Sequence, residues 1–399
     1  MTTETVYRAA FVLPVTSSPI RDGFVAVRDG VVTAVGPIAE RPTGAGAVEI
    51  DLGRTLLMPG FVNAHTHLEL SHLEGAVPGD RGFVPWIEDQ LRVRAERPAD
   101  EIAGAISRAI ATLQAHGTAA VADVSNSLAA VGPLKESALH ALVLHEILGF
   151  DPDKAHSVME QTTAIRAAAN ENLNANDNVN VDAAANLNVN FDANAGPVAS
   201  HVRIEVAAHA PHSVSRELFG LLMKHGGVRS IHVAESRAED DFLRDGGGDW
   251  RPFLDLRIGY VPFKPPGTTP VRYLDELGVL TPGLLAVHCV RVDADDAKLL
   301  AARGAVAVLC PRSNEFLGNG VPPLALLLGS GVPLAFGTDS LASCPSLDVL
   351  EDARFLARKF PGVPGTVLLH ALTRGGAIAL GFPKLGEIRA GAQFDSGSF

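Results

Sequence analysis

The stretch PGFVNAHTHLELSH, residues 59–72, determines how the rest of the sequence is interpreted. It continues an apolar segment, RTLLMPGFV, of the kind that forms a buried strand, and it then presents three histidines and a glutamate. Alternate residues of a strand face the same side, so the side chains of His65 and His67 can point to one place. Two histidines at this spacing can be ordinary surface residues or half of a metal site. The residues at the ends of the other strands distinguish these two interpretations.

Seven further apolar runs follow this stretch, and segments of helical character separate them. The eight candidate strands are residues 60–65, 118–124, 140–148, 204–210, 230–235, 284–290, 305–311 and 333–339. They are nearly all apolar rather than alternating, which is typical of parallel strands that are buried on both faces. Eight strand–helix repeats predict an α/β fold of the (β/α)8 TIM-barrel type. A doubly wound open sheet is the alternative, but no G-x-G-x-x-G turn follows the first strand.

The segments on either side of the barrel predict a second, smaller unit. Residues 1–57 contain the β-branched runs FVAV, VVTAVG and AVEIDL, broken by RDG and by Gly and Pro. They predict a small β-rich, sandwich-like domain that residues 383–399 complete, while residues 58–382 form the barrel. Residues 170–199 are Asn-rich and of low complexity. We interpret them as an insertion between the third and fourth barrel strands and assign them no function.

Composition narrows the class of partner. The chain has 399 residues and a formal net charge of −12, which argues against nucleic acid or an anionic membrane because phosphates repel a negative surface. The N-terminus lacks the pattern of a signal peptide, and no apolar run reaches the roughly 18 residues that a membrane span needs. The three cysteines form no C-x-x-C pair. We therefore expect a cytoplasmic protein that acts on a small molecule.

Titratable side chains close five of the candidate strands. They are His65 with His67, His209, His232 with Glu235, His288, and Asp339. In a barrel of this type the C-terminal ends of the strands form the active-site face, so these side chains would share one rim. Independent structural histidines have no reason to collect there, and we interpret the set as a functional site.

The chemistry of this set predicts a metal centre. Imidazole and carboxylate ligands suit Zn, and also Fe or Ni, but not Ca or Mg. We predict that His65, His67, His232 and Asp339 bind one divalent transition metal, Zn in the first place and Fe as the alternative, with room left for a water. The metal lowers the pKa of that water toward about 7, and Asp339 would orient the water and take its proton. Glu146 could bridge this metal to a second one, but we favour a site with one metal.

Each of the neighbouring residues has two possible roles. Glu235 can give a proton to a substrate ring nitrogen, with a salt-bridged loop glutamate as the alternative. His288 can hydrogen-bond the water and move its proton, or have a structural role. Glu69 can contact the substrate or hydrogen-bond a ligand imidazole. Trp86 can line a lid over the site or pack in the interior.

Six motifs in order resemble the amidohydrolase superfamily, and within it the cytosine deaminase-like branch of nucleobase and nucleoside deaminases. They are PGFVNAHTHLE, HAPHSVS, IHVAES, AVHCV, LCPRSNEFLGNG and FGTDSLAS. The resemblance implies one Zn or Fe, the same four ligands, proton transfer by Glu235 and His288, and contact of His209 with the substrate. HTHLELS and PRSNEFLGNG are most similar to aminodeoxyfutalosine deaminases of an alternative menaquinone biosynthesis pathway. By analogy, the resemblance also implies a homodimer.

The resulting prediction is hydrolytic deamination of an adenine-containing nucleoside or related compound, with aminodeoxyfutalosine as the specific candidate. A chlorohydrolase-like or cyclic-amide hydrolase of the same superfamily is the alternative, and a catalytically silent binding paralogue is a remote one. The sequence departs from the pattern at Arg291, where some relatives have a second histidine, and at the tail GEIRAGAQFDSGSF, which stops where relatives usually continue.

Overall fold

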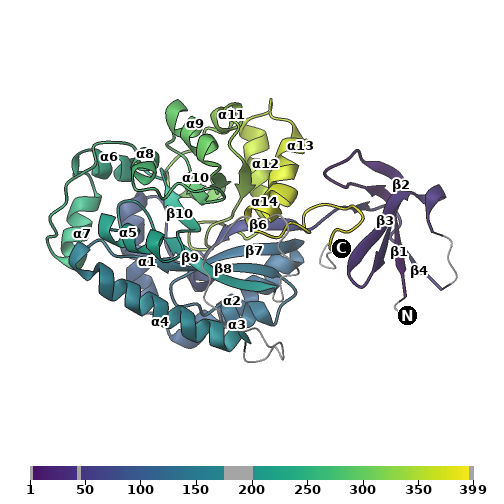
Figure 1. Cartoon of the computed structure of the whole chain (residues 1–399), viewed down its shortest axis with the longest axis horizontal. Coiled ribbons are helices and arrows are strands. Elements are labelled where there is room, and N and C mark those ends of the chain that lie inside the picture. Colours follow the sequence, from purple (N-terminus) through teal and green to yellow (C-terminus); the bar gives the residue numbers. More distant parts are fainter. Residues whose placement is uncertain (1–2, 43–45, 175–200, 395–399) are drawn as a thin grey trace.

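The computed structural model describes residues 3–42, 46–174 and 201–394, and it contains two sheets (Figure 1). The larger sheet has eight parallel strands in strict chain order. They are β6 (Phe61–Thr66), β7 (Thr118–Ser125), β8 (His140–Ile147), β9 (Val202–Ala208), β10 (Ser230–Val233), β11 (Leu285–His288), β12 (Val306–Leu309) and β13 (Leu334–Phe336). Each overlaps a strand predicted from the sequence, and the predicted (β/α)8 barrel is confirmed.

The first and last barrel strands meet at a seam. The backbone N–H groups of Thr338 and Asp339, just after β13, both donate to the carbonyl of His65 at 3.1 Å. Gly337 makes this approach possible, because a Cβ at this position would lie 2.6 Å from the Cβ of His65. Real side chains do not tolerate that distance, so the seam needs glycine here.

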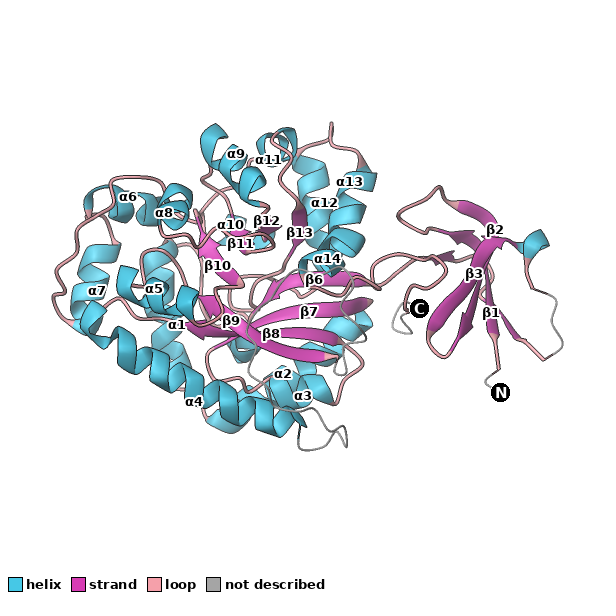
Figure 2. Ribbon diagram, in the orientation of Figure 1, coloured by secondary structure: helices cyan, strands magenta, loops and turns pink. Residues whose placement is uncertain are grey.

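Helices surround the strands on the outside (Figure 2). They are α1 (Phe83–Ala95), α2 (Ala99–Ala115), α3 (Val131–Lys135), α4 (Ala155–Asn174), α5 (Arg216–Lys224), α6 (Arg237–Asp245), α7 (Trp250–Ile258), α8 (Pro270–Glu276), α9 (Ala294–Arg303), α10 (Pro311–Phe316), α11 (Leu324–Gly329), α12 (Val349–Lys359), α13 (Gly365–His370) and α14 (Gly376–Ala379), with the short turns η1 (Ile38–Glu40), η2 (Leu68–Leu73), η3 (Pro152–Lys154) and η4 (Ala371–Gly375). Their ends follow local chemistry. For example, α9 begins with a capping box between Asp293 and Asp296 and ends at Gly304, whose φ is 68°.

Apolar side chains fill the interior of the barrel. Alternate residues of the strands point inward, among them Val62 and Ala64 of β6, Val124 of β7 and Val287 of β11, and all four are buried. A second apolar layer packs the outer faces of the strands against the helices. Because the middle of the barrel is filled, polar groups on the strands can reach a substrate only at the strand ends.

The smaller sheet combines both ends of the described chain. β1 (Thr5–Val12) pairs with β2 (Ile20–Arg28) on one side and with β4 (Val48–Asp51) and β5 (Leu56–Leu57) on the other, and β3 (Val31–Pro37) pairs with β2. The C-terminal segment, yellow in Figure 1, runs to this sheet. There the N–H of Val32 donates to Ala392 at 2.9 Å, and the ring of Phe394 stacks on Tyr7. The domain boundaries at 57/58 and 382/383 stay predictions.

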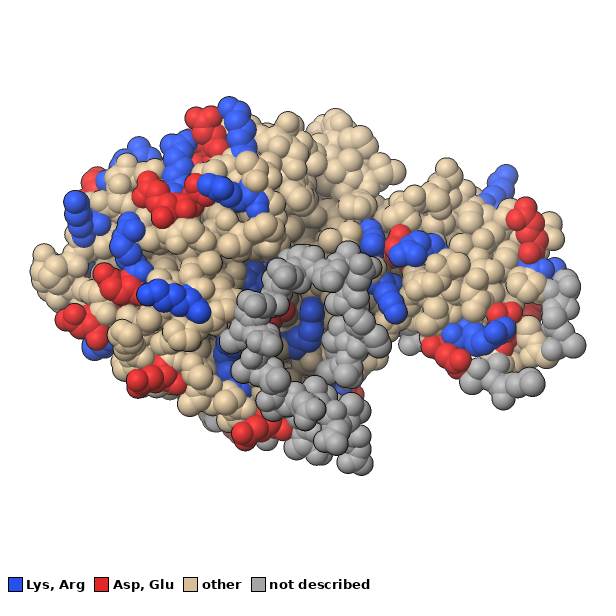
Figure 3. Space-filling model, in the orientation of Figure 1, with Lys and Arg blue, Asp and Glu red and all other residues tan. Residues whose placement is uncertain are grey.

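Two further sequence predictions concern segments rather than the barrel. The Asn-rich insertion at 170–199 begins within the last turns of α4, and its remainder lies outside the described residues. None of the described helices combines the length and the apolar character that a bilayer crossing requires. Acidic and basic side chains are interspersed on the face of the barrel shown in Figure 3.

Candidate active site

The four predicted metal ligands converge at the C-terminal rim of the barrel. The Nε2 atoms of His65 and His67 each lie 3.6 Å from Oδ1 of Asp339. The ring of His232, at the end of β10, is centred 5.0 Å from that of His65 and 5.5 Å from that of His67. The ring of His288, at the end of β11, is 5.4 Å from His232. One potential ligand atom from each of His65, His67 and Asp339 lies within 4.8 Å of the others.

Asp339 is held so that one carboxylate oxygen is free for this cluster. Its Oδ2 accepts hydrogen bonds from the hydroxyls of Ser313 at 2.6 Å and Ser343 at 3.0 Å, while Oδ1 faces the imidazoles. Burial alone would raise the pKa of Asp339, but its interactions with His65 and His67 hold that pKa well below its ordinary value. The group is therefore an ionised carboxylate, as a metal ligand or a proton acceptor must be.

His232 is oriented by the backbone, and burial lowers the pKa of both His65 and His232. Nδ1–H of His232 donates to the backbone carbonyl of His209 at 2.8 Å, which leaves Nε2 of His232 for the cluster. Burial, followed by the charge of His65, lowers the pKa of His232 well below its ordinary value. Both ring nitrogens of the fully buried His65 lack a hydrogen-bond partner among the described residues. Buried imidazoles are normally partnered, so this set of nitrogen and oxygen donors fits a Zn-type or Fe-type metal.

Glu235 and His288 face each other beside this cluster. Nε2 of His288 lies 3.6 Å from Oε2 of Glu235, and the Asn319 amide donates to Oε1 of Glu235 at 3.3 Å. Burial, with the charge of Asp339, raises the pKa of Glu235 well above its ordinary value, which favours the protonated acid over the carboxylate. Burial lowers the pKa of His288 to about 3, which keeps its imidazole neutral.

Left-handed backbone at the strand ends directs these side chains inward. Positive φ angles occur at Ala234 (52°), His288 (76°), Cys289 (49°) and Asp339 (62°), none of which is glycine. Such residues each cost on the order of 1–3 kcal/mol and persist only where the surroundings enforce them. Here the N–H of Cys289 donates to Val233 at 3.1 Å, so neighbouring strands fix the turn.

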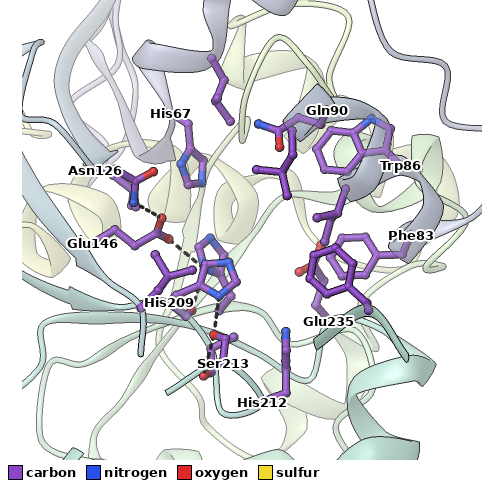
Figure 4. Close-up of a pocket in the computed structure, with 18 of the residues that line it drawn as sticks. His67, Phe83, Trp86, Gln90, Asn126, Glu146, His209, His212, Ser213 and Glu235 are labelled. Carbon is purple, nitrogen blue, oxygen red and sulfur yellow. Dashed lines mark hydrogen bonds and ion pairs between the residues drawn. The ribbon is translucent and has the colours of Figure 1, made fainter. Parts of the chain in front are cut away.

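A cavity of about 490 Å³ opens above the cluster (Figure 4). One wall is apolar and comes largely from helices α1 and α7. The lining includes His67, Glu69, Phe83, Trp86, Gln90, Arg94, Asn126, Glu146, His209, His212, Ser213, Glu235, Trp250, Phe253, His288 and Asp339. The size is in the range of small-molecule sites.

The three predicted substrate contacts, His209, Trp86 and Glu69, all line this cavity, but they differ in whether their polar groups are free to meet a ligand. His209 presents its ring with Nδ1 hydrogen-bonded to the hydroxyl of Ser213 at 2.6 Å. Trp86, on α1, is 7% exposed and stacks with Phe83, so it lines the cavity and also packs in the interior. Contact of Trp86 with a substrate stays a prediction.

The carboxylate of Glu69 is already bound by the protein. Its Oε1 accepts hydrogen bonds from the Ser125 hydroxyl, from the Ser127 N–H at 2.9 Å and from the Ser127 hydroxyl at 2.6 Å. Its Oε2 lies 3.3 Å from Arg94 of α1. Glu69 therefore ties α1 to the end of β7, and no hydrogen bond links it to a ligand imidazole among the described residues.

Several site residues have no sequence signal of their own. Ser313 and Ser343 come from two different segments and meet only at Asp339. Trp250 begins a short helix that follows three glycines, a context that does not predict a site. Glu146, by contrast, was considered from the sequence as a bridging ligand, and it lines the cavity, with Oε2 bound to the Asn126 amide at 2.9 Å and Oε1 3.6 Å from Nδ1 of His232.

Comparison with known proteins shows the family. The sequence model of the amidohydrolase family matches residues 56–397. The chain belongs to the amidohydrolase family. The resemblance predicted from the sequence motifs is thereby confirmed, and this amidohydrolase is a hydrolase of carbon–nitrogen bonds in a metal-dependent family.

Characterised relatives match along most of the amidohydrolase. It is 32% identical to an aminodeoxyfutalosine deaminase of Deinococcus radiodurans, over 90% of this chain and 81% of the relative. It is 30% identical to a 5-methylthioadenosine/S-adenosylhomocysteine deaminase of Pelotomaculum thermopropionicum, over 94% of this chain and 79% of the relative. Among solved structures, an adenosine deaminase of Xanthomonas campestris with bound zinc is 26% identical and superposes with a TM-score of 0.76, covering 98% of this chain and 83% of that one.

Proposed function

We propose that this amidohydrolase hydrolyses the exocyclic C–N bond of an adenine-containing nucleoside and releases ammonia, with aminodeoxyfutalosine as the specific candidate. The relatives described above act on such nucleosides according to their names. One observation carries the proposal: Glu235 and Asp339 are both buried and line the same cavity, and their pKa values are shifted in opposite directions. Two carboxyl groups with pKa values shifted in opposite directions are the pattern of an acid and a base with separate tasks.

His65, His67, His232 and Asp339 would hold the metal. The three imidazoles and one carboxylate suit Zn, and Fe as the alternative, and the zinc in the Xanthomonas campestris structure supports Zn. Bound there, the metal supplies Lewis acidity that makes water nucleophilic near neutral pH.

The residues of the chain supply the proton transfers. Asp339 accepts the proton of the attacking water, because it is ionised and its Oδ1 faces the cluster. Glu235 gives its proton to the ring nitrogen next to the carbon under attack, which removes negative charge from the ring. His288, 3.6 Å from Glu235, orients the water and passes the proton toward the departing amino group. The second proton of the water returns to Glu235 as the C–N bond breaks, so water and the amine become a ring carbonyl and ammonia and the side chains regain their starting states.

The cavity wall would bind the rest of the substrate. His209 meets the purine ring, since it lies directly beside the ligand His232 at a ring distance of 5.2 Å. Trp86 provides an aromatic surface at the cavity wall. Glu69 acts by holding Arg94 at the wall, where the guanidinium can face the substrate.

An ammonia-release screen tests the proposal. The purified protein, loaded with Zn, is assayed for ammonia with adenosine, 5-methylthioadenosine, S-adenosylhomocysteine, aminodeoxyfutalosine, guanine and cytosine. It is also assayed for chloride release from a chlorinated triazine and for ring opening of a lactam. We expect turnover of one or more adenine nucleosides and loss of that turnover in Glu235→Gln. Turnover of the triazine or the lactam alone would contradict the proposal and support the alternative hydrolase. Placement in menaquinone biosynthesis, a cytoplasmic location and a homodimer stay predictions from the sequence.

A further inference from the structure

A stacked pair of rings forms part of the cavity wall outside the metal cluster. The imidazole of His212, in the turn after β9, lies 4.1 Å from the ring of Trp250 with an interplanar angle of 27°. Trp250 is the first residue of α7, and both side chains are 3% exposed. Figure 4 shows His212 projecting toward the pocket. The pair therefore belongs to the cavity surface and not to the helix–strand packing alone.

His212 has hydrogen-bonding capacity that the protein does not use. Neither ring nitrogen has a hydrogen-bond partner among the described residues, although both atoms are buried. Its neighbour His209 differs, because the Ser213 hydroxyl is bonded to Nδ1 of that ring. Burial lowers the pKa of His212 well below its ordinary value, so the ring is neutral and offers one donor and one acceptor. Buried polar groups without partners are uncommon and usually have a function.

The position of His212 fits the part of a nucleoside beyond the purine. Ring centres step outward from the ligand His232 to His209 at 5.2 Å and on to His212 at 5.9 Å. A purine that presents its amino carbon to the cluster directs its N9 substituent away from the cluster. A sugar at that place needs hydrogen-bond partners for its hydroxyls and a flat surface for its apolar face. The His212–Trp250 pair supplies both.

We propose that His212 is a specificity-determining residue that hydrogen-bonds the sugar of the nucleoside, and that stacking on Trp250 holds its ring in place. This proposal rests on the proposed function for the class of substrate. It assigns the two residues to sugar recognition and gives them no part in the proton transfers.

Replacement of His212 by Phe isolates the hydrogen bonds, because phenylalanine keeps a ring that can stack on Trp250. Loss of one hydrogen bond to a bound ligand corresponds to about a tenfold change, and loss of two to about a hundredfold. We expect His212→Phe to raise KM for adenosine by about ten- to a hundredfold with kcat changed by less than about threefold. For 9-methyladenine, which lacks the sugar, both constants should change by less than about twofold.

Binding measurements give a readout that does not need turnover. In calorimetric titrations, His212→Phe should weaken the binding of inosine by about the same factor. Its binding of 9-methylhypoxanthine, which lacks the sugar, should be unchanged. Trp250→Ala should weaken inosine binding as well, and Trp250→Phe should restore most of it. The matched control is His225→Phe, because His225 is exposed and its ring bonds to the carbonyl of Leu221 in the preceding helix, away from the cavity. This variant should behave as wild type.

Two results would overturn the proposal. Equal losses for adenosine and 9-methyladenine in a folded His212→Phe variant would show a purely structural role, and unchanged binding of both would show no contact with the sugar. Failure of the proposed function looks different. A wild-type protein that binds inosine but releases no ammonia from any 6-aminopurine would refute the reaction and leave the sugar comparison intact.

Discussion

Replacement of Gly337 by Ala tests the barrel seam and the metal cluster together. An alanine Cβ would lie 2.6 Å from the Cβ of His65, 2.8 Å from the carbonyl oxygen of His65 and 3.0 Å from Sγ of Cys310. Carbon atoms in contact prefer roughly 3.5–4.0 Å, so the two strands have to separate by about 1 Å. Two of the three obstructing atoms belong to His65, which no rotation of its side chain can move away. The substitution therefore displaces a predicted metal ligand.

The magnitude follows from these contacts. Overpacking of this kind costs about 1–3 kcal/mol of folding free energy. A misplacement of about 1 Å in an active site can lower activity by about 10²-fold. We expect Gly337→Ala to lower the melting temperature by a few degrees, to lower metal affinity, and to lower kcat/KM by about one hundredfold.

Differential scanning fluorimetry, metal analysis and the ammonia assay measure the three effects. The matched control is Gly329→Ala, the same substitution at the end of α11, where a new Cβ meets no heavy atom within 4 Å. That variant should retain full activity and a melting temperature at or slightly above that of wild type. A Gly337→Ala protein as stable and active as the Gly329→Ala protein would refute the close approach of β6 and β13.

Further predictions concern the chemistry of the site. Asp339→Asn should lower turnover by at least about 10³-fold with an unchanged far-UV circular dichroism spectrum, and near-normal activity would contradict its role. Ser313→Ala should weaken metal binding or activity by about 10–100-fold in a chelator competition, and equal affinity would show that Asp339 needs no such support. Because the pKa of Glu235 is raised and its protonated form is the active one, kcat/KM should fall as the pH rises through that pKa. The small residual activity of Glu235→Gln should not fall over the same pH range, and a fall that persists in this residual activity would assign the pH dependence to another group. Chelation of the metal should stop ammonia release and Zn or Fe should restore it, whereas activity that survives complete metal removal would exclude the proposed chemistry.

The barrel could be predicted because its strands have a strong local signal. Runs such as TAAVADV and HALVLHEIL are apolar at nearly every position. This pattern follows from the burial of a parallel strand on both faces and does not depend on particular partner residues. The ends of the strands were less predictable. β10 was expected to reach residue 235 but ends at Val233, because the chain turns into a left-handed conformation at Ala234. No local pattern marks such a turn at an alanine.

The site residues were likewise predictable where a local pattern marked them and unpredictable where their roles depend on contacts between distant segments. Spacing along one strand placed His65 beside His67, since alternation is a property of the backbone. The roles of Glu69 could not be resolved, because its partners Ser127 and Arg94 come from a different loop and a different helix. Likewise, only the folded chain brings Trp250 to the ring of His212. Contacts between distant segments carry no periodic signal.

The pairing of residues 388–394 with the N-terminal sheet sets an order for biosynthesis. Backbone bonds from Gly391 to Val32 and from Phe394 to Gly30 join the two ends of the described chain, and the whole barrel is translated between them. A nascent chain on the ribosome must keep the edge of β3 unpaired until the last segment emerges. Pairing between segments so far apart in the sequence is slow, and the edge of β3 stays exposed until the pairing forms. Expression yield should therefore respond more to chaperone supply and to changes near residue 390 than to equally conservative changes in the barrel helices.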